Sequence, residues 1–182
     1  LTATGEDMTA TASATVIVEE PADVIRLEAD SEMSGYIRSS GDERTTGMYI
    51  GDDNANREIQ GFLTYRINDI PDDATIGRVI LDLSGYDLPY SSPYPGLGCL
   101  RAFVHEYSML GGQYWSGDVS DPIEEWCSLA DLEASIPSEG IGQALQYEVG
   151  ETKFQLRLQF SDATSDWDET RDLLHWQKDG MP

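Results

Sequence analysis

Four aspartates near the C-terminal end of the chain have side chains with the chemistry that binds calcium. They are Asp162, Asp166, Asp168 and Asp172. Calcium takes about six to eight hard oxygen ligands, and carboxylates at alternate positions, as at Asp166 and Asp168, supply them. The spacing lacks the glycine and terminal glutamate of an EF-hand loop, so a solvated acidic loop without an ion stays open as the alternative. A second candidate is the run Asp52, Asp53 and Asn54.

Three tyrosines stand between prolines in the segment YDLPYSSPYPGL. They are Tyr86, Tyr90 and Tyr94. Rigid, exposed tyrosines stack on sugar rings or anchor a protein partner, which makes them candidates for ligand contact. The alternative is that their rings cover one end of the fold.

Residues for acid–base or nucleophilic catalysis are few. The two histidines, His105 and His175, lie in strand-like alternation, and we interpret them as packed or surface residues. The sequence contains no nucleophile elbow, zinc-protease helix, phosphate loop or dinucleotide fingerprint. Its 34 carboxylates are too numerous to single out a glycosidase pair. We therefore expect a non-catalytic protein without a cofactor, calcium excepted.

The two cysteines, Cys99 and Cys127, belong to no CxxC metal or redox motif. In an extracellular protein they would form one disulfide, which would restrain the loop-rich segment around Trp115. Two buried thiols are the alternative.

Composition excludes several classes of partner. The chain has 182 residues, 40% of them hydrophobic, which suits one globular domain with an appendage. It carries 34 acidic and 11 basic residues, a net charge of -23. Such a surface repels phosphate backbones and anionic lipid, so we expect neither nucleic acid nor membrane insertion. An extracellular, calcium-rich or salty environment suits it.

Strand patterns dominate the elements that must position these residues. The sequence KFQLRLQF alternates strictly, which predicts that Phe154, Leu156, Leu158 and Phe160 face inward and that Gln155, Arg157 and Gln159 face outward. Further strands are predicted for TGMYIG, GFLTYRI and LRAFVHEY. One short helix is predicted in SDPIEEWCSLADL, where Asp121 would cap and Pro122 would fit the first turn. Many strands with one brief helix indicate an all-β sandwich.

The stretch FLTYRINDIPDDATIGRVILDL predicts two strands, 62–67 and 76–83, that cross the sandwich. Pro71 bars ladder hydrogen bonds between them, and Asp72 and Asp73 keep the connection in solvent. We interpret this stretch as scaffold rather than as a reactive site.

Several motifs resemble those of a known family. They are Ala29-Asp30, Arg57, Phe62, Ile70-Pro71 and Ala74-Thr75-Ile76, followed by YWSGDVSDPIEEW and RLQFSDATSDWDETRDLLHW. Over residues 24–182 the chain is similar to DNRLRE-type and related carbohydrate-binding-like jelly rolls of secreted bacterial and archaeal proteins. The resemblance implies a jelly-roll β-sandwich on the cell surface or outside the cell. It implies little about function.

Two departures from that family pattern suggest how the chain assembles. The family pattern implies one more strand after Pro182, so we expect an open groove and unpaired backbone groups in the sandwich. Residues 1–20 read as a β extension that resembles the terminal hairpin of an immunoglobulin-like domain. Within it, one face is formed by Ala12, Ala14, Val16 and Val18.

These residues predict a donor strand that enters the next copy of the chain, giving a head-to-tail filament by donor-strand complementation. The alternative is that residues 1–20 are the remnant of a neighbouring domain and have no role in assembly. A second functional hypothesis is a carbohydrate-binding module of a larger secreted protein, with polysaccharide as its ligand.

Overall fold

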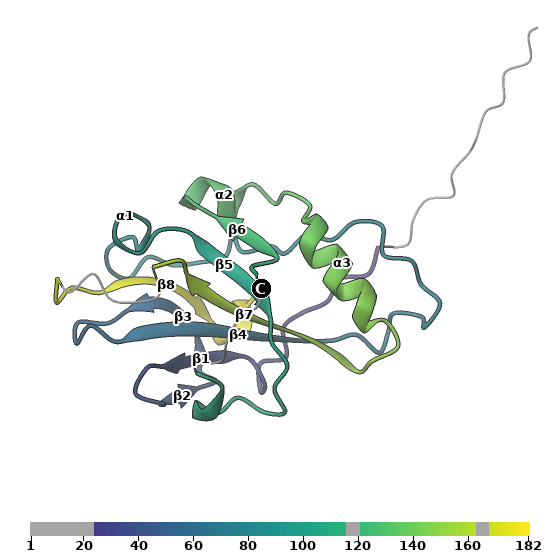
Figure 1. Cartoon of the computed structure of the whole chain (residues 1–182), viewed down its shortest axis with the longest axis horizontal. Coiled ribbons are helices and arrows are strands. Elements are labelled where there is room, and N and C mark those ends of the chain that lie inside the picture. The colour runs from purple at the N-terminus through teal and green to yellow at the C-terminus, as the bar shows by residue number, and fades with distance from the viewer. Residues whose placement is uncertain (1–23, 116–120, 163–167) are drawn as a thin grey trace, which may run out of the picture.

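The computed structural model describes residues 24–115, 121–162 and 168–182, which form an antiparallel β-sandwich (Figure 1). The predicted all-β fold is thereby confirmed. Its strands are β1 (Gly35–Arg38), β2 (Glu43–Arg44), β3 (Gly47–Asp52), β4 (Glu58–Arg66), β5 (Leu100–Val104), β6 (Glu124–Trp126), β7 (Lys153–Phe160) and β8 (Asp172–Gln177). The helices are α1 (Tyr94–Leu97), α2 (Leu129–Glu133) and α3 (Glu139–Glu148), with 3-10 turns η1 (Gly112–Tyr114) and η2 (Lys178–Gly180). The predicted extension over residues 1–20, with its donor residues, lies outside the described residues.

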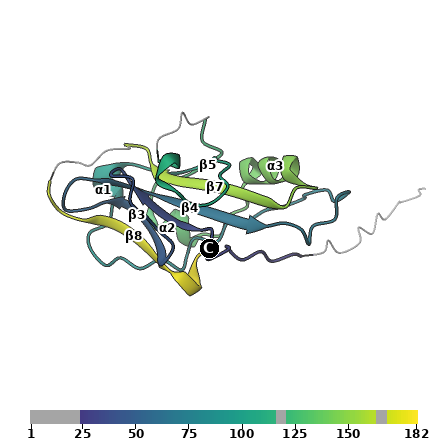
Figure 2. The ribbon, with the colours of Figure 1, turned by 90° about the horizontal axis from the view of Figure 1, so that it is seen from below.

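The strands divide into two layers. The first sheet has the order β2-β1-β4-β7-β5-β6. Strand β3 pairs with β4 only next to the connecting turn, at Gly51 and Asp52, and then pairs along its whole length with β8. In Figure 2, β3 and β8 lie to one side of β4 and β7. Side chains of both layers meet in one buried cluster that contains Ile50 and Trp176 from the second layer and Leu156 from the first.

The alternating pattern of β7 is confirmed on its inner face. All four predicted inward residues, Phe154, Leu156, Leu158 and Phe160, belong to the main buried cluster. The predicted outward residues Gln155, Arg157 and Gln159 do lie on the opposite face, but the structure buries them as well. The segment after β5 folds back over this face. Its residue Tyr107 forms a second buried cluster there with Ile37 of β1 and Phe62 of β4. Alternation of apolar and polar residues therefore does not show whether a later segment will cover the polar face of a strand.

A buried hydrogen-bond network joins that covering segment to the sheet. The Thr64 hydroxyl donates to the Tyr107 hydroxyl oxygen at 2.7 Å and accepts from the Gln155 amide at 2.9 Å. The Gln155 side-chain oxygen in turn accepts from the Tyr107 backbone N–H at 2.9 Å. The polar atoms that this network removes from water thus form hydrogen bonds with one another.

We expect Tyr107→Phe to lower the free energy of unfolding by about 1–3 kcal/mol, because it leaves the buried Thr64 hydroxyl without its acceptor. Denaturant unfolding measures the loss. The matched control is Tyr114→Phe, since the Tyr114 hydroxyl contacts Ser108 in an exposed bond. Equal stabilities of the two variants would contradict the importance of the network.

The prediction of a strand over residues 76–83 is wrong in one respect. The segment runs from Ala74 to Leu83 without a turn, and Val79, Leu81 and Leu83 are more buried than Ile80 and Asp82, as the alternation requires. It forms no ladder with any strand of the described chain. The apolar pattern correctly predicted which side chains of this segment face inward. It does not show whether another strand lies beside the segment to form a ladder.

The predicted helix start at Asp121 and Pro122 is also wrong. Glu124–Trp126 form β6, because they pair with Leu100–Ala102 of β5. The helix begins later, at α2, where the Ser128 hydroxyl accepts from the Asp131 N–H at 3.3 Å. Tertiary pairing has thus overridden a local capping signal.

The longest helix, α3, was not predicted. Its first turn is capped by Ser138, whose hydroxyl accepts from the Ile141 N–H at 3.0 Å. Two glycines in SEGIGQALQYE weaken the helical signal. Gly140 is needed there, because a Cβ atom would collide with the Ile123 carbonyl oxygen. None of the helices in the described ranges is long and apolar enough to span a bilayer.

Candidate functional site

The three predicted ligand tyrosines do not form a common surface. The Tyr86 hydroxyl donates to Glu133 at 2.9 Å, and its ring stands edge-on to Trp176. The Tyr94 ring packs edge-on against Phe160, with its centroid 5.3 Å away, and burial raises the pKa of its hydroxyl. Tyr90 is about half exposed at 49%. Only Tyr90 therefore presents a ring to solvent.

That one exposed ring already has a partner. The Arg171 guanidinium lies 4.8 Å from the centre of the Tyr90 ring, and an Arg171 nitrogen donates to the Tyr90 hydroxyl at 2.5 Å. A second nitrogen of Arg171 donates to the Asn54 side chain at 3.2 Å. This contact ties the tyrosine loop to the start of β8 and holds the ring in place.

The structure brings only some of the predicted calcium ligands together. Asp162 follows β7, and its backbone N–H donates to the Leu97 carbonyl. Asp168 accepts from the Thr170 hydroxyl, which also donates to Asp172 at 3.2 Å. Asp172 is buried on β8, directly opposite Asp52 on β3. Asp166 lies outside the described residues, so calcium binding by this loop stays a prediction.

Of the second calcium candidate, Asp53 is committed to an ion pair. Asp53 accepts two hydrogen bonds from the Arg57 guanidinium through one carboxylate oxygen, at 2.7 and 3.0 Å, and Arg38 approaches to 3.8 Å. Burial acts to raise the pKa of Asp53, but these hydrogen bonds, with those of the Ala55 and Arg57 backbone N–H groups, lower it overall. The carboxylate thus anchors the turn between β3 and β4.

The cysteines are joined. Cys99 and Cys127 form a disulfide with Cα atoms 4.1 Å apart, next to the pair Leu100 and Trp126 of β5 and β6. In the part of the chain that the structure describes, Cys99, Glu125 and Cys127 are the one group of three metal-ligating side chains that come within 4.8 Å of one another. Because both sulfurs are bonded to each other, this group has no thiolate to offer a metal.

Neither histidine is arranged as a catalytic base. His175 stacks on Tyr49 with ring centres 4.1 Å apart, and burial lowers its pKa. His105 packs edge-on against Phe62, and burial lowers its pKa too. Among the described residues, no serine, threonine or cysteine forms a hydrogen bond with either ring.

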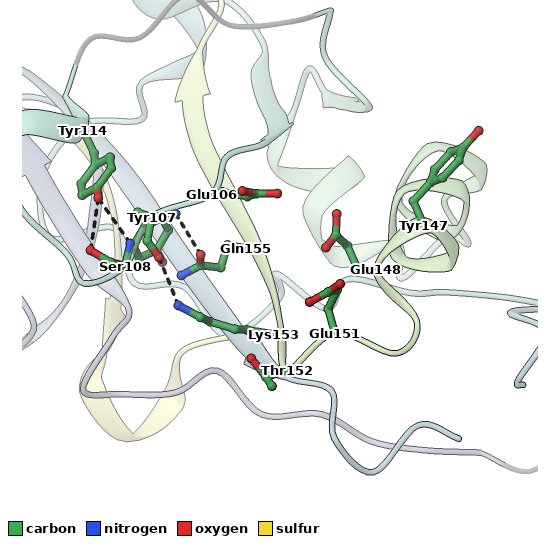
Figure 3. A pocket seen from close by; sticks show the side chains of 10 residues that line it. All are labelled: Glu106, Tyr107, Ser108, Tyr114, Tyr147, Glu148, Glu151, Thr152, Lys153 and Gln155. Atoms are coloured by element: carbon green, nitrogen blue, oxygen red, sulfur yellow. Dashed lines mark hydrogen bonds between the residues drawn. The ribbon is translucent and has the colours of Figure 1, made fainter. Parts of the chain in front are cut away.

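A hollow of about 740 Å³ opens between β7, the segment after β5 and the end of α3 (Figure 3). Glu106, Glu148 and Glu151 point toward one another across it. Burial raises the pKa of Glu148, and the charges of the other two carboxylates raise it further. The Lys153 amine donates to the Tyr107 carbonyl oxygen at 3.3 Å. The hollow gathers negative charge, and among its described lining residues no hydroxyl forms a hydrogen bond with a carboxylate.

A second hollow, of about 520 Å³, lies on the other side of α3, against Ile76–Val79. Tyr147 on α3 lines both hollows and is 87% exposed. Tyr147 is not among the site residues predicted from the sequence. Its signal is the helical pattern, because Ile141 and Leu145 form the buried stripe of α3 and Tyr147 lies off that stripe.

The segment 77–83 is the third candidate, because its main chain is almost without hydrogen bonds. In the described chain its backbone makes two: the Ser138 N–H donates to the Val79 carbonyl at 2.9 Å, and the Trp176 indole N–H donates to the Leu83 carbonyl at 3.2 Å. Unpaired backbone of a strand-like segment is a template for an additional strand.

The fold and these three features define an antiparallel β-sandwich with an incompletely paired edge. No protein-family model matches the chain, and no curated protein matches it.

Proposed function

We propose that this chain is a non-catalytic, extracellular structural subunit that assembles head to tail into a filament by donor-strand complementation. The observation that carries the proposal is the unpaired segment 77–83. Its side chains already alternate as those of a strand, with Val79 and Leu81 packed against the main cluster. An added strand would give its backbone the hydrogen bonds that the described chain does not supply.

Residues 11–19 supply a matching donor. Thr11 to Val18 contain no charged side chain, although the whole chain has a net charge of -23. Only Glu19, at the end of the donor, is charged, so the rest of the strand approaches an acidic subunit without electrostatic repulsion. Its β-branched residues favour an extended backbone. A donor on one copy and an acceptor on the next form a heterologous contact, which builds open fibres when the rotation does not close.

The disulfide supports the extracellular location, because such bonds persist mainly in oxidising compartments. The carbohydrate-binding alternative has less support, since a single tyrosine of the three presents its ring to solvent and Arg171 occupies that ring.

Deletion of residues 1–20 is expected to convert filaments into monomers. Electron microscopy of the whole chain should show filaments, and sedimentation of the truncated chain should give one species of monomer mass. A free peptide of residues 11–19 should bind the truncated chain and raise its melting temperature by mass action, without restoring filaments. If the truncated chain stays as polymeric and as stable as the whole chain, strand donation is wrong.

A further inference from the structure

We infer that the acceptor for the incoming strand is one particular edge of the segment Arg78–Asp82, the edge formed by the backbone of Arg78, Ile80 and Asp82. The occupant is residues 11–19 of a second copy of this chain. The inference rests on the proposed function and adds to it the site at which the copies join.

Hydrogen-bond parity identifies the edge. In an extended strand the N–H and C=O groups of one residue point to one edge, and those of the next residue point to the opposite edge. The two bonded carbonyls belong to Val79 and Leu83, both odd-numbered, so Ser138 and Trp176 occupy the odd edge. The N–H and C=O groups of Arg78, Ile80 and Asp82 make no hydrogen bond in the described chain.

The odd edge is closed by packing as well. Ser138 is the N-cap of α3, so an incoming strand on the odd edge would have to displace the start of this helix. Gln146 of α3 binds two even-numbered residues, because its side chain accepts from the Ile76 N–H at 2.8 Å and donates to the Ala74 carbonyl at 3.2 Å. The open part of the even edge therefore begins at Arg78. There an incoming strand adds without breaking a described hydrogen bond.

The faces of the donor match the faces of this segment. Val79, Leu81 and Leu83 face the core, while Ile80 is 42% exposed. A strand paired in register carries its inward side chains on the same face as those of its neighbour. The small donor residues from Ala12 to Val18 would then continue the inner layer, and Ile17 would lie on the outer face with Ile80.

Length and position also fit. Residues 11–19 span about 30 Å as a strand, more than the roughly 17 Å of Arg78–Asp82. The described chain begins at Val24, at the end of the molecule that carries α3 (Figures 1 and 2). Arg26 is near enough to Asp82 for its charge to help lower the pKa of that carboxylate, after the hydrogen bonds from Ser84 and against the effect of burial. The first described residues therefore lie close to the proposed acceptor.

Two single substitutions in the whole chain test the inference, because one disables the acceptor and the other disables the donor. Ile80→Pro removes an N–H from the even edge and sets a ring against the incoming strand. Thr15→Pro disables the donor in the same way. We expect each variant alone to sediment as a monomer, and an equimolar mixture to give a dimer that cannot extend, because one variant keeps the donor and the other keeps the acceptor. The control Ile80→Thr keeps the N–H and should form filaments like the parent.

The outcomes separate the two proposals. If Ile80→Pro forms filaments while Thr15→Pro does not, strand donation stands and the even edge is wrong. If Thr15→Pro also forms filaments, the proposed function itself fails. Hydrogen–deuterium exchange gives a test that needs no substitution in the acceptor or the donor: the Arg78, Ile80 and Asp82 amides should exchange at least about tenfold more slowly in filaments of the whole chain than in the monomeric deletion of residues 1–20. Equal exchange at these amides would overturn the inference.

Discussion

Removal of the Cys99–Cys127 disulfide is expected to lower the free energy of unfolding by about 3 kcal/mol. The two cysteines are 28 residues apart in the sequence, and closing a loop of this length restricts the unfolded chain by about 3–4 kcal/mol in the chain-entropy description. The bond also holds β6, a strand of three residues that pairs with β5 alone. The effect should therefore exceed that of a surface substitution.

Chemical denaturation of the double variant Cys99→Ala, Cys127→Ala, compared with the parent, measures this loss. The single variants control for the side-chain changes, since either one already opens the loop. Both should lose about as much as the double variant. An unchanged midpoint, or mass spectrometry that finds two thiols in natively isolated material, would contradict the bond.

Glu58 should make the protein less stable as the pH rises from about 4.5 to about 7. Burial at the start of β4 raises the pKa of Glu58 to about 7, although Gln60 donates to its carboxylate at 3.1 Å and Arg157 adds an attractive charge. The folded state therefore holds this proton over a range in which the unfolded state has released it. The stability due to the neutral carboxyl group is fully present below the pKa that Glu58 has in the unfolded chain. It is lost as the pH rises through the pKa that Glu58 has in the folded protein.

The expected size of this loss is on the order of 3 kcal/mol, at 1.36 kcal/mol for each unit of pKa. Glu58→Gln should match the parent near pH 4 and be more stable at pH 8, as denaturant unfolding at both values would measure. The control is Glu32→Gln, which removes the same charge at an exposed position. If both variants gain equally at pH 8, the effect comes from net charge and the burial of Glu58 is not its cause.

The sequence predicted which side chains of a strand face inward better than it predicted which segments lie beside or over that strand. Alternation placed Phe154 to Phe160 correctly because a side-chain period of two reports burial on one face. It could not show that Gln155 and Arg157 lie under a later segment, since that depends on contacts far along the chain. For the same reason the strand-like residues 76–83 gave no sign that they would lack a ladder.

The candidate site was harder to predict than the fold. Tyr86, Tyr90 and Tyr94 are evenly spaced, but burial and Arg171 give each ring a different environment. Tyr147 was missed because the glycines of α3 hid the helix that displays it. The donor residues Ala12 to Val18 lie outside the described residues, so their role stays a prediction.

The pairing of β3 with β8 also sets the order in which this chain can fold. Gly47 pairs with Gln177 and Asp52 with Asp172, so every residue of β3 finds its partner in β8, 120 to 130 positions later. Such distant pairings slow folding, because the closure of the intervening chain precedes the contacts that reward it. During synthesis, Met48 and Ile50 therefore lack their β8 partners until residues 172–177 have been made, and apolar surface left open in that interval favours aggregation.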